Sequence, residues 1–187
     1  PYGAFWAGSM MDPSDRKTRT GTIWRLDPNG TARAMVHDLG ISNGIAFDAQ
    51  RKRFYCADTY ADVQTVWRFD HDPRTGDISN RQVFVTTHEL PGRPDGACLD
   101  SDGCYWMALA GGWALARITP AGKLDRLVKL PVEKPTMCAF GGSNLDILYV
   151  TSIGHGYLPM GEGQPQAGGI FACRPGVTGV PEGFFAG

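Results

Sequence analysis

The chain alternates short apolar stretches with polar turns, and one such phrase occurs twice in nearly the same form. Ile41–Asp48 and Gly92–Asp100 each contain a polar side chain, a glycine and an alternating run that ends in aspartate. A second apolar stretch follows each of them after a turn, at Arg53–Asp58 and at Cys104–Leu109. Alternation with a period of two is typical of strands that bury one face. The pattern therefore predicts two equivalent pairs of strands.

The repeat extends along the chain. Aligning Phe5, Phe54, Tyr105 and Leu148 gives spacings, by subtraction of residue numbers, of 49, 51 and 43 residues. We expect four short strands in each unit, and four strands at a period of about 40 to 50 residues are typical of propeller blades. The sequence thus predicts an all-β protein, a β-propeller. A strand-rich sandwich is the alternative, but it does not require the same phrase to recur at this period.

Composition agrees with such a fold and excludes some partners. The 187 residues are 42% hydrophobic and 20% charged, which is ordinary for a globular protein. The 25 glycines and 13 prolines are scattered as turn residues, which favours many short elements. A formal net charge of -1 provides no basic surface, so we expect no nucleic-acid partner. No run approaches the roughly 20 apolar residues of a membrane span, so we expect no membrane partner and a cytoplasmic location.

The cysteines do not form a recognisable framework. Five of them are widely spaced and fall mostly inside apolar strand patterns: Cys56, Cys98, Cys104, Cys138 and Cys173. An odd number at such spacing does not suggest disulfides, and the absence of a Cys-x-x-Cys pair argues against a zinc site of the finger type. We expect five reduced, buried thiols.

The repeat also brings polar residues together. In a propeller the first strand of every blade lines a central channel, and Asn43, Asp95 and Thr136 open these strands here. Gly44 and Gly96 allow the backbone to approach closely. Amide and carboxylate oxygens that converge on an axis suit a divalent cation. The alternative is that Asn43 and Asp95 only cap turns, as most Asn-Gly and Asp-Gly dipeptides do.

Several phrases together resemble a known family, the gluconolactonases, which include senescence marker protein (regucalcin) and luciferin-regenerating enzyme. The resemblance covers nearly the whole chain, and it rests on seven phrases in order: Ile41–Gly44, Thr75–Arg81, Pro94–Gly96, Asp102–Trp106, Leu130–Val132, Phe140–Gly142 and Leu148–Ser152. It implies a six-bladed propeller with one divalent metal at its axis, and hydrolysis of sugar lactones.

The resemblance also implies roles for single residues. Asn43 matches the family's asparagine ligand, and Asp95 matches its aspartate, which is both metal ligand and catalytic residue. The family's third ligand, a glutamate near the N-terminus, and its substrate-binding Arg and Asn have no counterpart in this sequence. Residues 1–187 therefore resemble the C-terminal two-thirds of a single propeller domain, roughly four blades, with the N-terminal blades absent. No cofactor besides one divalent metal (Ca, Zn, Mg or Mn) is implied.

Two functions remain open on this basis. In the first, a cation held by Asn43 and Asp95 polarises a lactone carbonyl while Asp95 acts as the base, so that a gluconolactone-like sugar lactone opens to the hydroxy acid. In the second, the same pocket belongs to a calcium-binding or sugar-binding module of the regucalcin type without turnover. The ligands are the same in both, so the sequence does not separate them.

Other candidates have simpler explanations. Asp70–Gly76 resembles part of a calcium loop but lacks the later bidentate Glu, which favours a hairpin turn. His155 could act as an acid or base, although a rim loop histidine is the simpler interpretation. Trp113, between a glycine and an alanine, could stack on a sugar ring. Five acidic residues, at strand ends, in turns or in the Gly-rich loop near the C-terminus, are interpreted as solvated: Asp58, Asp62, Glu89, Asp102 and Glu162.

Overall fold

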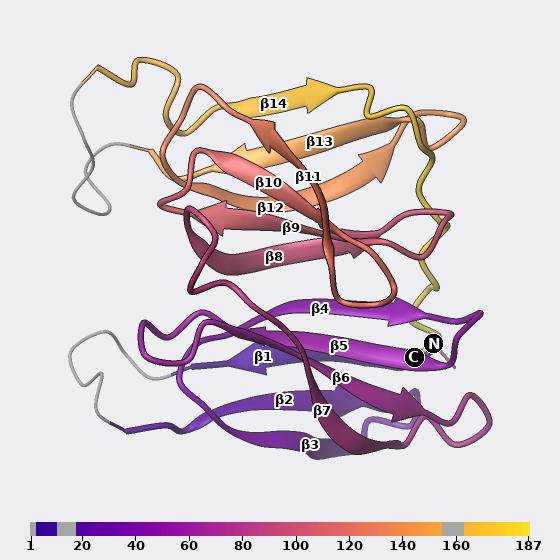
Figure 1. Cartoon of the computed structure of the whole chain (residues 1–187). Helices are drawn as coiled ribbons and strands as arrows, with labels where there is room; N and C mark the ends of the chain where they lie inside the picture. Colours follow the sequence, from indigo (N-terminus) through magenta and orange to yellow (C-terminus); the bar gives the residue numbers. More distant parts are fainter. Residues whose placement is uncertain (1–2, 11–17, 155–162) are drawn as a thin grey trace.

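The structure is a computed structural model, and it describes residues 3–10, 18–154 and 163–187 (Figure 1). His155 and Glu162 lie outside the described residues. The described residues form fourteen strands in four separate sheets, with no helix among them. Within each sheet the strands follow one another in chain order and every neighbouring pair is antiparallel. The all-β prediction is confirmed.

Two sheets contain the four strands that the repeat predicts. The first of these consists of β4 (Ser42–Asp48), β5 (Arg53–Asp58), β6 (Thr65–His71) and β7 (Ile78–Thr86). The other consists of β8 (Arg93–Leu99), β9 (Tyr105–Ala110), β10 (Ala114–Ile118) and β11 (Leu124–Lys129).

The other two sheets contain three strands each in the described residues. The sheet nearest the N-terminus consists of β1 (Phe5–Ser9), β2 (Gly21–Leu26) and β3 (Ala32–Leu39). The sheet nearest the C-terminus consists of β12 (Pro135–Gly141), β13 (Ile147–Ser152) and β14 (Ile170–Cys173). Because β1 aligns with the second strands β5, β9 and β13, the first sheet contributes no innermost strand among these residues.

Each pair of neighbouring sheets shares a buried core, because the middle strands are apolar on both faces. In β9, Tyr105 and Met107 pack toward the sheet of β4–β7, while Trp106 and Ala108 pack toward the sheet of β12–β14. Phe54 of β5 joins the core shared with the first sheet. Stacking of sheets through alternate residues of one strand is the packing expected between propeller blades.

The innermost strands of three sheets lie side by side. β4 contacts β8, and β8 contacts β12 (Figure 1). A Cβ built on Gly96 of β8 would lie 2.7 Å from the Thr136 backbone oxygen of β12, so the two strands approach closely at this point. The first strand of each of these units therefore faces a shared axis, as the propeller prediction requires.

A buried carboxylate, Asp100, anchors the C-terminal end of β8 through hydrogen bonds. Asp100, which follows this strand, is 1% exposed and accepts hydrogen bonds from the Trp106 indole and from the Arg117 guanidinium, both at 2.8 Å. It also accepts backbone N–H groups of Asp102 and Cys104. A buried carboxylate with four donors is fully compensated. This network is structural, and it lies at the opposite end of β8 from Asp95.

All five cysteines are free thiols, in agreement with the sequence. Four are buried and Cys173 is half-buried. The Cys98 and Cys138 sulfur atoms are 3.7 Å apart, in hydrogen-bonding contact and not in a covalent bond. No helix in the described part of the chain is long and apolar enough to cross a membrane.

Candidate functional site

The two residues singled out by the repeat lie near the starts of adjacent innermost strands. Asn43 is the second residue of β4, and Asp95 is the third residue of β8. Both side chains are half-buried. The pairing with the second strand is irregular at both places: in β4 a bulge begins after Asn43, between Asn43 and Ala46, and in β8 Asp95 lies within a bulge between Pro94 and Ala97. Bulges of this kind locally interrupt the ladder.

A close approach of the backbones joins the two positions. The hydroxyl group of the fully buried Tyr105 donates a 2.7 Å hydrogen bond to the Gly44 carbonyl oxygen. Gly44 has φ of 59°, and a Cβ built on it would lie 3.2 Å from the backbone oxygen of Asp95. The residue after Asn43 therefore lies directly against Asp95. Thr136, the third residue expected at the axis, shares a 2.8 Å hydrogen bond with Thr151 of β13.

A third residue, which the sequence reasoning missed, links these two positions. Thr59 follows β5, is 6% exposed, and its hydroxyl oxygen accepts a 2.9 Å hydrogen bond from the Asn43 side-chain nitrogen. The same hydroxyl donates to the backbone oxygen of Pro94, at 2.5 Å. The repeat could not reveal Thr59, because β9, the counterpart of β5, ends at Ala110 and is followed by Gly111, so no threonine stands at the matching position. The only signal was a threonine directly after Asp58, at the end of a buried strand.

The interpretation of Asp58 as a solvated residue is wrong. Asp58 is 1% exposed, and its carboxylate accepts the backbone N–H groups of Gly40, Ile41 and Tyr60 at 2.9, 2.9 and 3.0 Å. Three donors offset the cost of burying the charge. Asp58 thereby fixes the chain that enters β4 and the chain that leaves β5, so it supports both Asn43 and Thr59.

Asp95 has little to compensate its charge. Burial raises the pKa of this carboxyl to about 6, and a hydrogen bond from the Gly96 backbone and the charge of Arg93 offset only part of that effect. Among the described residues, no cationic side chain lies within ion-pair distance of it. By contrast, Asp100 is paired with Arg117. An under-compensated carboxylate is suited to receive a cation.

The raised pKa predicts that Asp95→Asn stabilises the protein in the absence of metal. The folded state holds the Asp95 proton more tightly than the unfolded state, so stability falls as pH rises from about 4 to about 6. At pH 7.5 the neutral amide should raise the free energy of unfolding by about 1–2 kcal/mol, after allowance for partial exposure. Urea unfolding in EDTA measures this. At pH 4 the difference should vanish, and a destabilised variant at pH 7.5 would contradict the expectation.

Two other sequence candidates have plain structural roles. The Asp70–Gly76 segment joins β6 to β7 as a hairpin turn, in which the Gly76 N–H donates to the Asp72 backbone oxygen at 2.7 Å. Trp113 lies in the turn from β9 to β10, at the same end of its sheet as Asp95, and it is 42% exposed with φ of 54°. Its backbone is bonded to Leu130 and Glu133 of the next connection. The hairpin interpretation is confirmed, and sugar stacking by Trp113 stays a prediction.

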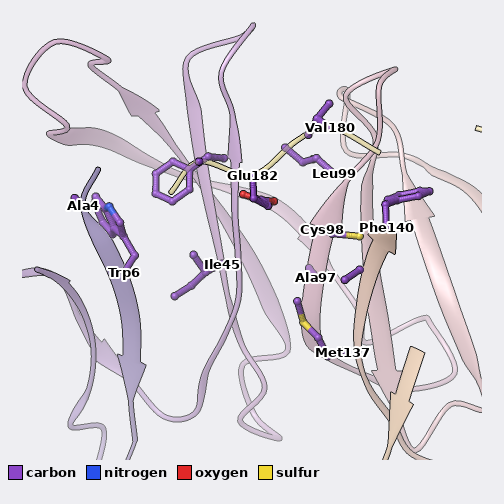
Figure 2. A pocket seen from close by; sticks show the side chains of 13 residues that line it. Ala4, Trp6, Ile45, Ala97, Cys98, Leu99, Met137, Phe140, Val180 and Glu182 are labelled. Atoms are coloured by element: carbon purple, nitrogen blue, oxygen red, sulfur yellow. The ribbon is translucent and has the colours of Figure 1, made fainter. Parts of the chain in front are cut away.

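An apolar cavity lies further along the same strands. It has a volume of about 290 Å³, and Figure 2 shows its walls. They come from β1, β4, β8, β12 and the C-terminal segment: Ala4, Trp6, Ile45, Phe47, Ala97, Cys98, Leu99, Met137, Ala139, Phe140, Val180, Glu182 and Gly183. Of these described residues Glu182 alone carries a charge. Neither Asn43 nor Asp95 is among the residues that line this cavity.

The described residues do not contain a complete set of acidic or sulfur ligands. No three His, Cys, Asp or Glu side chains within the ranges that the structure describes are grouped closely enough to hold a metal ion. Asn43 and Asp95 supply two kinds of oxygen, which matches the preference of Ca²⁺ and Mg²⁺ and is accepted by Mn²⁺ and Zn²⁺. If both side chains bound a cation, several coordination positions would be left for water, for a substrate or for further residues.

Comparison with known proteins identifies the family. Residues 1–154 match the model of the SMP-30/Gluconolactonase/LRE-like region. The chain belongs to this family. It is 38% identical to the 6-deoxy-6-sulfogluconolactonase of Pseudomonas putida and 40% identical to the pentonolactonase XacC of Haloferax volcanii. The alignments cover 100% and 97% of this chain but 63% and 62% of those proteins, so it spans less than two thirds of their length.

A solved structure supports the fold. The chain superimposes on a calcium-binding protein, regucalcin, of Agrobacterium tumefaciens with a TM-score of 0.87 and 29% identity. The match covers 99% of this chain and 62% of that one. The family resemblance based on the seven phrases and the propeller fold predicted from the repeat are both confirmed. The roles of Asn43 and Asp95 stay predictions.

Proposed function

We propose that the protein is a metal-dependent sugar lactonase that hydrolyses a gluconolactone-like aldonolactone to the open hydroxy acid. Asn43 and Asp95 hold one divalent cation at the propeller axis, and Asp95 is the catalytic residue. The observation that supports the proposal is the under-compensated carboxylate of Asp95 on β8, next to the innermost strand β4, whose Asn43 amide is bonded to Thr59. The two lactonases among the similar proteins support the choice of substrate class.

The chemistry needs little more than this pair. A bound divalent cation would polarise the lactone carbonyl and stabilise charge on its oxygen. Asp95 accepts a proton from the attacking water. The Asn43 amide presents its oxygen, because its nitrogen is bonded to Thr59. A lactone is an activated ester, so no covalent nucleophile is required.

The proposal extends to the domain. We propose that residues 1–187 belong to a single propeller domain, because each sheet shares a buried core with the next. From the family resemblance, we also propose that the further carboxylate ligand lies outside this sequence. Tests of activity accordingly use the whole protein.

A second candidate is a calcium-binding module without turnover, favoured by the regucalcin structure that this chain resembles. The experiment that separates the two is proton release on addition of glucono-1,5-lactone to the whole protein, measured in a pH-stat with added Ca²⁺, Mg²⁺, Mn²⁺ or Zn²⁺ and with EDTA. Metal-dependent release above the spontaneous rate supports the lactonase. Saturable Ca²⁺ binding without release from any aldonolactone supports the module.

Asn43 should behave differently from Asp95 in that assay. Asn43→Ala removes a neutral ligand but leaves the base, so we expect weaker metal binding, by about tenfold, and a rate that partly recovers at excess metal. Titration of the rate with metal measures this. A rate that falls equally at all metal concentrations would contradict the assignment of Asn43 as a ligand.

A further inference from the structure

Thr59 lies between the two strands that carry the proposed ligands. Its side chain is buried, and its hydroxyl oxygen is shared by the Asn43 amide of β4 and the Pro94 carbonyl at the start of β8. Pro94 immediately precedes Asp95. The Thr59 backbone is itself fixed, because its N–H donates to the Ile41 carbonyl at 2.9 Å. One hydroxyl group therefore contacts both sides of the site.

The chemistry of this hydroxyl determines which way the Asn43 amide faces. A threonine hydroxyl has one hydrogen, and here the Pro94 carbonyl, which can only accept, takes it. The hydroxyl can then only accept from Asn43, so the group of Asn43 that faces Thr59 must be the NH₂. The amide oxygen consequently faces away from Thr59. With the amide reversed, two acceptors would meet at Thr59 and the nitrogen would take the place of the ligand oxygen.

We propose that Thr59 is a positioning residue that orients the Asn43 amide so that its oxygen is presented to a hard cation. The inference rests on the proposed function, since it deepens the cation site at Asn43 and Asp95. Thr59 touches neither cation nor substrate and acts through Asn43.

The test uses Tb³⁺, a hard cation whose luminescence lifetime in H₂O and D₂O reports the number of bound water molecules. In the whole protein, Thr59→Val keeps the side-chain volume and removes the hydroxyl group. We expect about tenfold weaker Tb³⁺ binding and up to one additional bound water, because Asn43 no longer presents its oxygen reliably. Thr59→Ser keeps the hydroxyl group and should stay within about threefold of the parent protein.

A double-mutant comparison separates positioning from general destabilisation. In the Asn43→Ala background, Thr59→Val should change Tb³⁺ affinity less than twofold, because the amide it orients has been removed. An equal loss in both backgrounds would overturn the inference, since a merely structural role acts without Asn43. Thr59→Val with the parent affinity and lifetime would also overturn it. If Thr59→Val does not fold, Thr59→Cys keeps a similar volume, weakens both hydrogen bonds and is read in the same way.

Failure of the metal site is a separate outcome. If the parent protein shows no saturable Tb³⁺ luminescence, the proposed cation site is rejected, and the role of Thr59 is rejected with it. If the parent binds Tb³⁺ with Asn43-dependent affinity while Thr59→Val is unchanged, the site stands and only the role of Thr59 is rejected. In the metal-free protein, the Asn43 side-chain NH₂ signals in ¹H–¹⁵N spectra should be slow to exchange in the parent and fast in Thr59→Val.

Discussion

Asp95→Asn is expected to lower kcat for aldonolactone hydrolysis by a factor on the order of 10² to 10⁴ in the whole protein at saturating metal. The substitution keeps an oxygen ligand and nearly the same volume, but it removes the negative charge and the proton acceptor. Some metal should still bind, because the amide oxygen and the Asn43 oxygen remain. The loss should therefore fall on kcat at every metal concentration, unlike that of Asn43→Ala.

Asp77, in the sheet of β4–β7, offers a matched control for this substitution. Asp77→Asn makes the same chemical change at an exposed residue in the turn between β6 and β7, at the end of the blade away from Asn43. It should leave kcat unchanged. Activity of Asp95→Asn within about threefold of the parent would reject the general-base role, because a base lost at a cost below roughly 1 kcal/mol was not accepting the proton. The alternative function, a calcium-binding module without turnover, becomes preferable only if the parent protein itself shows no metal-dependent hydrolysis of the lactone.

The sequence could predict the sheets because their middle strands are apolar on both faces. Tyr105 and Met107 alternate with Trp106 along one strand, and both sets are buried, so a continuous apolar run between turns located each middle strand. The spacing of these runs predicted the blades. Asn43 and Asp95 could be placed on adjacent inner strands for the same reason, since equivalent positions of a propeller repeat meet at the axis.

The support of the site could not be predicted in this way, because it breaks the repeat. Thr59 has no counterpart after β9, so an alignment of the units passes over it. Asp58 was misinterpreted because an aspartate at a strand end is usually solvated, and only the fold brings Gly40, Ile41 and Tyr60 within reach of its carboxylate. Contacts made by loops between sheets depend on tertiary geometry, which residue types and spacing do not encode locally.

Gly44→Ala should be the most damaging small substitution at the site. A Cβ at this position would lie 2.2 Å from the Tyr105 hydroxyl oxygen and 2.9 Å from the Ala57 side chain, at a φ of 59° that alanine adopts only with strain. Because Tyr105 is fully buried, it has little room to move aside. Displacing its hydroxyl group would also break the bond to the Gly44 carbonyl. We expect a loss of more than about 3 kcal/mol in the free energy of unfolding.

Gly30→Ala separates the two causes of that loss. Gly30 also has a positive φ, 84°, but an added Cβ there would meet nothing within 4 Å. Gly30→Ala should therefore lower the free energy of unfolding by about 1 kcal/mol, through backbone strain alone. Urea unfolding of the parent and both variants in EDTA gives the comparison. Similar losses in the two variants would mean that the contact between β4 and β9 is loose. A much larger loss in Gly44→Ala, together with weakened Tb³⁺ binding, would show that the approach of β4 to its neighbours holds Asn43 and Asp95 together.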